Sequence, residues 1–456
     1  MGTVLRNARR LGDSALVAIR ISDSKIDRIG TPDSTWPAGD EMVDARGKLA
    51  ISGFVNAHTH LPMVLLRGLA DDVPLATWFA DRIWPIEKAL TPNDVYISTL
   101  LALAESIRFG VVAVADMYFH SDAVAQAVEE SGIRAVLSYG MVAPSLAERG
   151  EAELEKTERL VETWHEKAGG RIAVAVSPHA VYTCGEDVWR RAVDLATKRG
   201  LLIHTHLSET RSEVEEWRRK TGLTPPAYLE RLGAFSVPTL AAHCAHVDDA
   251  DIEILARNGV RVAHCPKSNA KLGSGVARLR SMRERGLCVA IGTDGAASND
   301  RLDVLEEARF ACLLARATSE DTQAVSALDA VALATTEGRR ALGLPKAEIE
   351  AGDPADIVLI DVDGPHTAPH HGAASTLMFS SQASDVTDVF VAGRPLMRDG
   401  RLLTIDQHRV QSEVARLAKR LRRDELPRLG GWTIPPSDGG GGRHGFGRGE
   451  EGGHRS

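Results

Sequence analysis

The stretch Gly53-Phe54-Val55-Asn56-Ala57-His58-Thr59-His60 decides the fold prediction, because it joins a short apolar run to a pair of histidines. Side chains on a β-strand alternate between two faces, so His58 and His60 point to the same side and can bind one cation together. The 16 histidines among 456 residues would give roughly half an HxH pair by chance. A second pair does occur, at His204-Thr205-His206. Taken alone, the first pair therefore also fits two hydrogen-bonded structural histidines.

Further apolar runs follow along the chain, and most of them end on a residue that can bind a metal or move a proton. Those ends are His179, His206 with Glu209, His243, His264 and Asp294. The runs cover 53–58, 111–116, 134–139, 172–177, 201–206, 239–244, 260–265 and 288–294, and helical patterns lie between them at 121–131, 151–166, 186–199, 248–258 and 276–286. Strands that alternate with helices predict an α/β fold, a parallel (β/α)8 TIM barrel, whose active site lies at the carboxyl ends of the strands.

The pattern divides the chain into four parts. Residues 1–52 and 345–405 carry short β runs that predict a small composite β-sandwich, and the barrel is expected over 53–344. An amphipathic helix is expected to begin at 406, within a C-terminal helix and arm that ends at 436. The tail 437–456 consists mostly of Gly, Arg, His and Glu, so we expect it to be disordered.

Composition excludes several classes of protein. Hydrophobic residues make up 43% and charged residues 25%, as in soluble globular proteins. The net charge of −8 argues against a nucleic-acid or membrane partner and favours a small molecule. No stretch approaches the ~18 apolar residues of a membrane span, and no apolar signal core follows the N-terminus. The cysteines lack metal-knuckle spacing and predict free thiols: Cys184, Cys244, Cys265, Cys288 and Cys312. We expect a cytoplasmic protein, and a homo-oligomer is possible from the sequence.

Three imidazoles and one carboxylate form a common ligand set for a catalytic divalent metal, and His58, His60, His206 and Asp294 supply it. Such a metal lowers the pKa of bound water from about 15.7 toward ~7, which favours hydrolysis. Glu209 is placed to carry protons, although it also fits a helix-start acid in Ser208-Glu209-Thr210. His243 fits either a group that stabilises developing charge or a satisfied core histidine.

Seven segments together resemble the amidohydrolase superfamily, within it the branch of 5-methylthioadenosine/S-adenosylhomocysteine deaminases and related chlorohydrolases. They are Gly53–His60, Trp84–Glu87, Ser177–His179, His204–Thr210, Ala241–Cys244, His264–Leu272 and Gly292–Asn299, and the similarity runs from about residue 1 to about 405. The resemblance implies that the four candidate ligands bind one Zn²⁺, with Fe²⁺ or Mn²⁺ as alternatives. It also implies that Glu209 shuttles protons and that Asp294 takes a proton from the metal-bound water.

The same resemblance implies contacts with the substrate. Glu87 would accept hydrogen bonds from ribose hydroxyls, although by itself it fits a helix-starting acid ahead of Lys88. His179 would contact the bound nucleoside, as would Glu209 and Asp294. Trp78 and Trp84 fit either the wall of a purine site or apolar packing under a loop.

Two absences and one departure refine this expectation. No lysine ends the run 172–177, which disfavours a two-metal site, and no H-x-E with P-C-x-x-C is present, which excludes the other zinc deaminase design. Tyr139 and Glu153 stand where some members that accept the homocysteine-bearing nucleoside carry Arg. S-adenosylhomocysteine is therefore a less expected substrate, unless nearby Arg149 substitutes.

We therefore expect a zinc-dependent aminohydrolase that converts a 6-aminopurine nucleoside to its 6-oxo product and ammonia. Candidate substrates are 5′-methylthioadenosine, 5′-deoxyadenosine, adenosine and S-adenosylhomocysteine. The alternative is an amidohydrolase of another amino- or chloro-heterocycle, such as an s-triazine, guanine, a pterin or aminofutalosine. Glu87 discriminates between them, because a free base has no ribose diol. A non-catalytic barrel is a third alternative, against which the candidate ligands together with Glu209 argue.

Overall fold

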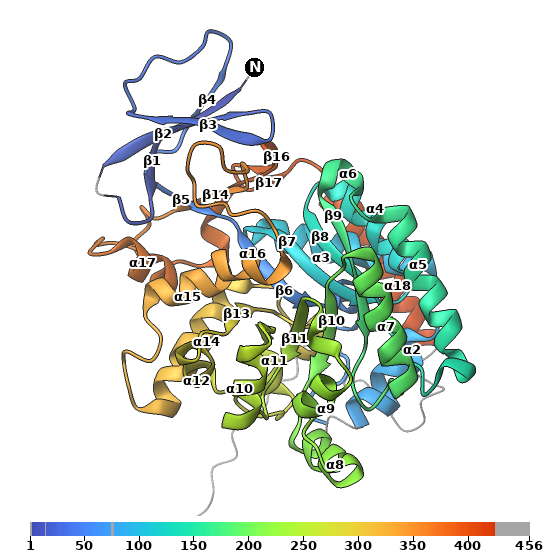
Figure 1. Ribbon diagram of the computed structural model, residues 1–456. Coiled ribbons are helices and arrows are strands. Elements are labelled where there is room, and N and C mark those ends of the chain that lie inside the picture. The colour runs from blue at the N-terminus through green and yellow to red at the C-terminus, as the bar shows by residue number, and fades with distance from the viewer. Residues whose placement is uncertain (1, 14, 74–76, 425–456) are drawn as a thin grey trace, which may run out of the picture.

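The computed structural model describes residues 2–13, 15–73 and 77–424 (Figure 1). Within this part, eight strands pair in chain order to form a parallel sheet. They are β6 (Phe54–Thr59), β7 (Val111–Tyr118), β8 (Arg134–Met141), β9 (Ile172–Pro178), β10 (Ile203–Leu207), β11 (Thr239–His243), β12 (Arg261–His264) and β13 (Cys288–Ile291). The first and last strands meet where the Asp294 N–H donates to the His58 carbonyl at 3.0 Å. The predicted (β/α)8 barrel is confirmed.

Helices follow the strands and cover their outer face, which explains why strands such as β7 are buried along their whole length. They include α3 (Pro92–Arg108), α4 (Ser121–Ser131), α5 (Glu151–Trp164), α7 (Glu186–Arg199), α8 (Arg211–Thr221), α9 (Pro225–Arg231), α10 (Asp249–Arg257), α11 (Pro266–Lys271), α12 (Leu279–Glu284), α14 (Val304–Ser319), α15 (Ala327–Ala334) and α16 (Thr336–Leu342). Capping boxes at Thr91, Asp248 and Ser326 start three of them. Helices α4 and α7 have the bounds that the apolar periodicity predicts.

The two ends of the chain build a second, mixed sheet from nine of the described strands. They are β1 (Thr3–Arg10), β2 (Leu16–Ser22), β3 (Lys25–Gly30), β4 (Glu41–Asp44), β5 (Lys48–Ser52), β14 (Ile357–Asp361), β15 (Val386–Val391), β16 (Arg394–Arg398) and β17 (Arg401–Leu402). The N- and C-terminal halves join where β5 pairs antiparallel with β14. Strands from both halves share one core, with Leu5, Ile19, Ile357 and Phe390 among its residues. Strand β1 pairs with β2, β4 and β5, so hydrogen bonds run continuously through this composite β domain.

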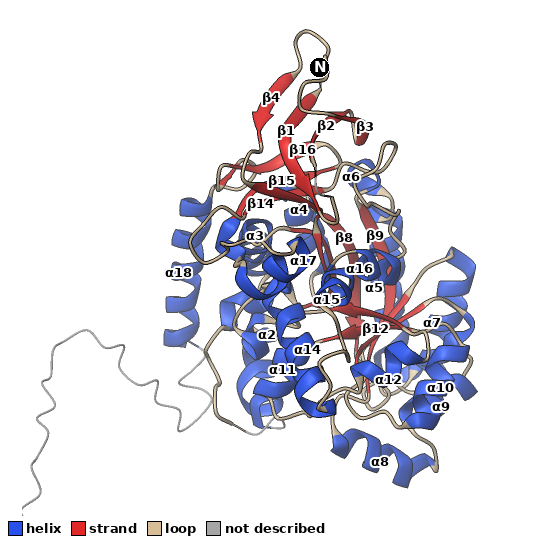
Figure 2. Ribbon diagram, turned by 90° about the vertical axis from the view of Figure 1, so that its left-hand side faces the viewer, coloured by secondary structure: helices blue, strands red, loops and turns tan. Residues whose placement is uncertain are grey.

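The terminal sheet lies at the amino-terminal ends of the barrel strands (Figures 1 and 2). The Gly53 N–H, just before β6, donates to the Asp356 carbonyl at 3.1 Å. Arg134, at the start of β8, forms an ion pair with the Asp356 carboxylate at 2.8 Å. Helix α8 lies at the opposite end of the molecule. The terminal sheet therefore leaves the carboxyl ends of the strands free to form a site.

The predicted C-terminal helix is α18 (Gln407–Asp424), which buries Val410 and Leu421 and pairs Arg420 with Asp94 of α3 at 2.6 Å. The predicted arm beyond residue 424 and the tail 437–456 lie outside the described residues. All five cysteines are described, and each is a buried free thiol as predicted. None of the helices within the described ranges is long and apolar enough to cross a membrane.

Candidate active site

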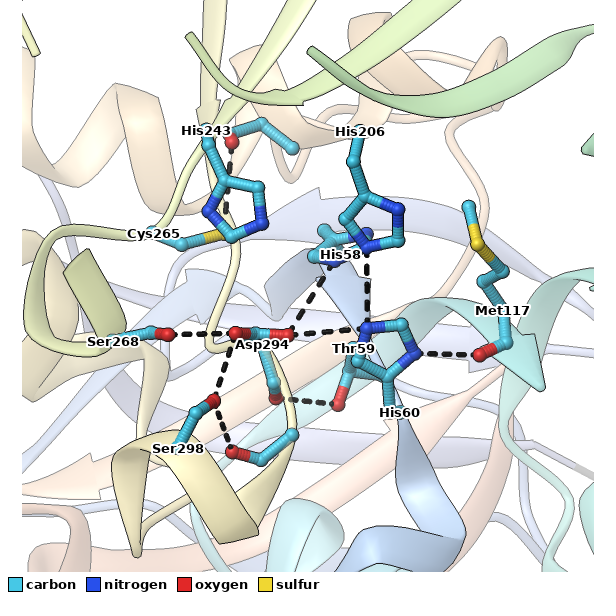
Figure 3. A network of polar contacts seen from close by, with 12 residues as sticks. His58, Thr59, His60, Met117, His206, His243, Cys265, Ser268, Asp294 and Ser298 are labelled. Carbon is cyan, nitrogen blue, oxygen red and sulfur yellow. Dashed lines mark hydrogen bonds and ion pairs between the residues drawn. The ribbon is translucent and has the colours of Figure 1, made fainter. Parts of the chain in front are cut away.

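The structure brings the four predicted metal ligands together at the carboxyl ends of three strands (Figure 3). His58 lies on β6 and His60 directly follows this strand, His206 lies on β10, and Asp294 follows β13. The Asp294 Oδ1 atom lies 3.2 Å from His60 Nε2 and 3.6 Å from His58 Nε2. The nitrogens of the three histidines lie within 4.8 Å of one another. This arrangement is a candidate site for a divalent metal ion.

Hydrogen bonds behind the cluster orient each imidazole. His60 Nδ1 donates to the Met117 carbonyl at 2.6 Å and His206 Nδ1 to the His179 carbonyl at 3.0 Å. A carbonyl only accepts, so each ring turns the lone pair of its Nε2 toward the cluster. These two Nε2 atoms lie 3.3 Å apart, where two lone pairs repel unless a cation or a proton lies between them.

His58 completes the ligand set. Its Nδ1 pairs with His204 Nε2 at 2.8 Å, behind the cluster. Its Nε2 is buried and has no hydrogen-bond partner among the described residues. An orphaned buried nitrogen beside a carboxylate is the geometry expected of a metal ligand, and the donor set of three imidazoles and one carboxylate fits a divalent ion.

Asp294 is held from both sides. Its Oδ2 accepts hydrogen bonds from Ser268 at 2.6 Å and Ser298 at 2.8 Å, which leaves Oδ1 for the histidines (Figure 3). Its backbone has a φ of 60°, a left-handed conformation that Asp tolerates, and its carbonyl accepts from the Thr59 hydroxyl at 3.0 Å. Burial alone would raise the pKa of Asp294, but the neighbouring imidazoles of His58 and His60 hold it well below its ordinary value.

The charges of the cluster favour a cation. Burial lowers the pKa of His58 to about 4, which keeps this ring neutral. Burial acts in the same direction on His60, but the Asp294 carboxylate outweighs it and raises the pKa of His60 to about 9. The site therefore stabilises a positive charge next to Asp294, and a metal ion can take the place of that proton.

Glu209 faces this cluster from the turn after β10. Its Oε2 lies 3.9 Å from His243 Nε2, and its Oε1 accepts from the Ser274 hydroxyl at 3.4 Å. The residue that caps α8 is Thr210, so the helix-start interpretation of Glu209 is wrong. His243 Nδ1 lies 2.9 Å from Asn269 Oδ1, which can only accept, so Nε2 faces Glu209. His243 is thus anchored on one nitrogen and presents the other to the cavity.

A cavity of about 940 Å³ opens over these residues. The predicted metal ligands His60, His206 and Asp294 line it together with Glu209 and His243. The predicted substrate-contacting residues Trp78, Trp84, Glu87 and His179 also line it. The structure thus brings the proton-transfer and substrate-contacting candidates to one space beside the cluster.

Glu87 reaches the cavity from the loop region after β6. It lies in the first and only turn of the helix α2 (Trp84–Glu87), as its interpretation as a helix-starting acid ahead of Lys88 expects. The side chain is buried, and its Oε1 finds no hydrogen-bond partner in the part of the chain that is described. Burial raises the pKa of Glu87 to about 7, against the opposing effects of the Tyr118 hydroxyl and His60. Next to it, the Trp84 ring stacks on the Phe79 ring, with 5.7 Å between the ring centroids.

A second cavity of about 390 Å³ adjoins the first, and both share Trp84, Glu87 and Phe119 as lining residues. In it the Tyr139 hydroxyl accepts a hydrogen bond from Lys156 Nζ at 2.9 Å. Lys156 also lies 3.0 Å from the Glu153 carboxylate, which pairs with Arg149 at 3.4 Å. Sequence reasoning considered Arg149 and missed Lys156, one of many charged residues in α5. Its position one helical turn after Glu153 was the available signal.

His179 contributes both its ring and its backbone. The ring lies 4.5 Å from that of His206, and its Nδ1 pairs with Thr183 Oγ1 at 3.1 Å. Burial lowers the pKa of His179 to about 3, so the ring is neutral. Sequence reasoning did not assign roles to Ser268 and Asn269, which follow the strand end at His264. A polar residue in the first turn after a barrel strand was the signal that could have identified them.

Comparisons with known proteins agree with this geometry. Residues 49–396 match the amidohydrolase family. A 5-methylthioadenosine/S-adenosylhomocysteine deaminase of Thermoanaerobacter pseudethanolicus is 46% identical over 384 residues, which cover 84% of this chain and 89% of the relative. A 5′-deoxyadenosine deaminase of Methanothermobacter thermautotrophicus is 42% identical over 86% of this chain and 91% of its own. The crystal structure of an adenosine deaminase from Xanthomonas campestris with bound zinc has a TM-score of 0.87 and 32% identity, covering 92% of this chain and 98% of that one. The chain belongs to the amidohydrolase family.

Proposed function

We propose that this protein is a metal-dependent hydrolytic deaminase that converts a 6-aminopurine nucleoside to the 6-oxo product and ammonia. The observation that carries the proposal is one cavity lined by metal ligands, by the proton carrier Glu209 and by the buried Glu87, whose Oε1 has no hydrogen-bond partner among the described residues. The similarity to relatives named as deaminases of adenosine-type nucleosides supports it.

We propose one zinc ion per chain as the cofactor, bound by His58, His60, His206 and Asp294. The convergence of these side chains and the zinc in the related crystal structure support this choice. When bound, zinc supplies Lewis-acid activation of water at neutral pH.

Glu209 moves the protons of the reaction. Hydrolysis at the amino-bearing ring carbon needs a proton on the adjacent ring nitrogen and later one on the departing amine. A carboxylate that is only weakly held by Ser274, at 3.4 Å, can change partners between these two positions. Asp294 is the base toward the attacking water, because its Oδ1 is free of the serine hydrogen bonds that hold Oδ2. His243 stabilises the charge that develops next to Glu209.

Glu87 and the aromatic residues hold the nucleoside. The Glu87 carboxylate, whose Oε1 has no partner among the described residues, accepts hydrogen bonds from the ribose diol, and a bond to a charged acceptor contributes about 1.5–3 kcal/mol. Trp84, Trp78 and His179 line the same cavity and contact the nucleoside there. The shared wall at Trp84 and Glu87 directs the 5′ substituent toward the second cavity.

Incubation with a substrate panel, with ammonia release measured, tests this function. The panel contains adenosine, 5′-deoxyadenosine, 5′-methylthioadenosine, S-adenosylhomocysteine, guanine, a pterin, aminofutalosine and an s-triazine. Turnover of the adenosine-type nucleosides, lost on chelation and restored by zinc, is the expected result. Turnover restricted to free heterocycles would favour the alternative activity, and no turnover at full metal content would favour a binding protein.

The five buried thiols support a further proposal, that the enzyme works in the reducing cytoplasm.

A further inference from the structure

The carboxylate of Glu213 holds the turn that carries Glu209. Glu213 lies in the first turn of α8, and its Oε1 accepts from the Ser208 N–H at 3.0 Å while its Oε2 accepts from the Glu209 N–H at 2.8 Å. Ser208 has a φ of 50°, a left-handed conformation that is uncommon for serine. Successive N–H groups around such a residue form a concave nest for an anion. In this protein the anion is a side chain of the same chain.

The opposite edge of the turn is fixed by the loop after β11. The Leu207 carbonyl accepts from the Cys244 N–H, and the Ser208 carbonyl accepts from the His246 N–H, both at 2.9 Å. The carbonyl groups are therefore tied to one segment and the N–H groups to Glu213. With both edges held, the Glu209 side chain leaves the turn toward His243 and Ser274.

Capping of α8 does not account for this arrangement. The Thr210 hydroxyl already caps the helix by accepting from the Glu213 N–H at 3.1 Å. The Glu213 carboxylate instead reaches beyond the cap to the two residues before it. Burial and the nearby Glu209 charge disfavour an ionised carboxylate here, and burial is the larger effect in raising the pKa of Glu213 to about 7. A buried carboxylate that accepts hydrogen bonds from the N–H groups of Ser208 and of the proton carrier points to a role in placing that carrier.

We infer that Glu213 is a positioning residue, which holds the Ser208–Glu209 backbone so that the Glu209 carboxylate stays beside His243 for proton transfer. The inference rests on the function proposed above, in which Glu209 moves protons. It separates two acids of one short segment into one that reacts and one that only orients.

Variants of Glu213 test the inference with the best substrate of the panel. Glu213→Ala should lower kcat by about 10- to 100-fold, because a displacement of about 1 Å in a reacting group has effects of this size. KM should change by less than about threefold and zinc content should stay at the wild-type level. The kcat of Glu213→Gln should lie between those of the wild type and Glu213→Ala, because its amide oxygen accepts from one of the two N–H groups. Glu215→Ala, an exposed acid of the same helix that does not line the cavity, is the matched control and should behave as wild type.

Two further measurements distinguish positioning from general support of the fold. In a Glu209→Gln background, Glu213→Ala should change the residual kcat by less than about twofold, because it acts through Glu209. An equal loss in both backgrounds, or a normal kcat for Glu213→Ala, would overturn the inference. A crystal structure of Glu213→Ala should show the Glu209 carboxylate displaced from His243, and an unmoved carboxylate would also refute it. The structural readout decides the matter even if no nucleoside is turned over, a result that would refute the proposed function instead.

Discussion

Each histidine of the cluster is oriented by a different hydrogen-bond partner, so the effect of substituting a ligand can be predicted. His206 is fixed by the His179 carbonyl, so it turns one lone pair toward Asp294 and the other imidazoles. His206→Ala or Asp294→Ala should remove metal and activity together, because each residue supplies one of four ligands. Metal analysis of the purified variants tests this, with the exposed His408→Ala of α18 as control. Full metal content and turnover in either ligand variant would show that the assigned set is wrong.

A variant of Glu209 separates metal binding from proton transfer. Glu209→Gln keeps the shape of the side chain but cannot carry a proton. We expect normal zinc content and a loss of kcat of about 10²–10⁴-fold. Steady-state kinetics and metal analysis on the same preparation measure both quantities. A near-normal rate would place proton transfer on another group.

Glu87 should give the pH dependence of nucleoside use. Burial raises the pKa of this carboxyl to about 7, so it is charged above that pH and neutral below it. Only the charged form accepts hydrogen bonds from both ribose hydroxyls. We expect kcat/KM for a nucleoside to fall as the pH is lowered through about 7, because this parameter follows ionisations of the free enzyme. The pH profile of Glu87→Gln, measured on the same nucleoside, should lack this step. A step that persists unchanged in the variant would assign it to another residue.

We expect helix α5 to determine which 5′ substituents the second cavity accepts, because Lys156 of this helix lines it. Glu153 lies between Lys156 and Arg149 and compensates both charges, so a substrate carboxylate must compete with it. We expect a preference for neutral 5′ groups, with kcat/KM for 5′-methylthioadenosine about a hundredfold above that for S-adenosylhomocysteine. Glu153→Gln should reduce this preference, because it frees Lys156 next to Tyr139. Equal use of both substrates by the wild type, with selective loss of S-adenosylhomocysteine in Lys156→Met, would contradict the prediction.

In the molecule as a whole, the terminal sheet is attached to the barrel through the buried carboxylate of Asp356. Asp356 precedes β14 and binds Arg134 at 2.8 Å and Arg339 at 2.9 Å, with its own side chain fully buried. Asp356→Ala leaves both guanidinium groups without a counter-charge, so the free energy of unfolding should fall by about 3–5 kcal/mol. Denaturant unfolding measures this change. Glu186→Ala breaks a half-exposed pair with Arg190 and should cost no more than about 1 kcal/mol. Similar effects of the two variants would show that the Asp356 cluster does not stabilise the molecule.

The barrel and the end at which its site lies could be predicted from local patterns. Strands such as β7 and helices such as α4 each carry their own periodicity, which depends on neighbours a few residues apart. The pair His58 and His60 could be placed on one face of a strand for the same reason. Because the carboxyl ends of parallel strands meet at one end of a barrel, Asp294 could be expected near them before any contact was known.

The division of roles among similar residues depended on contacts between distant segments. Of the second HxH pair, His206 faces the cluster, whereas His204 supports His58 from behind, and their alternation on β10 shows only that they share a face. Lys156 meets Tyr139 because α5 packs beside β8, and Glu213 reaches back to the backbone of Glu209. Local periodicity reports which face a residue occupies, but a partner across two elements is determined by how those elements pack. For that reason the ligand chemistry was accessible from the chain, while the supporting contacts emerged only from the folded structure.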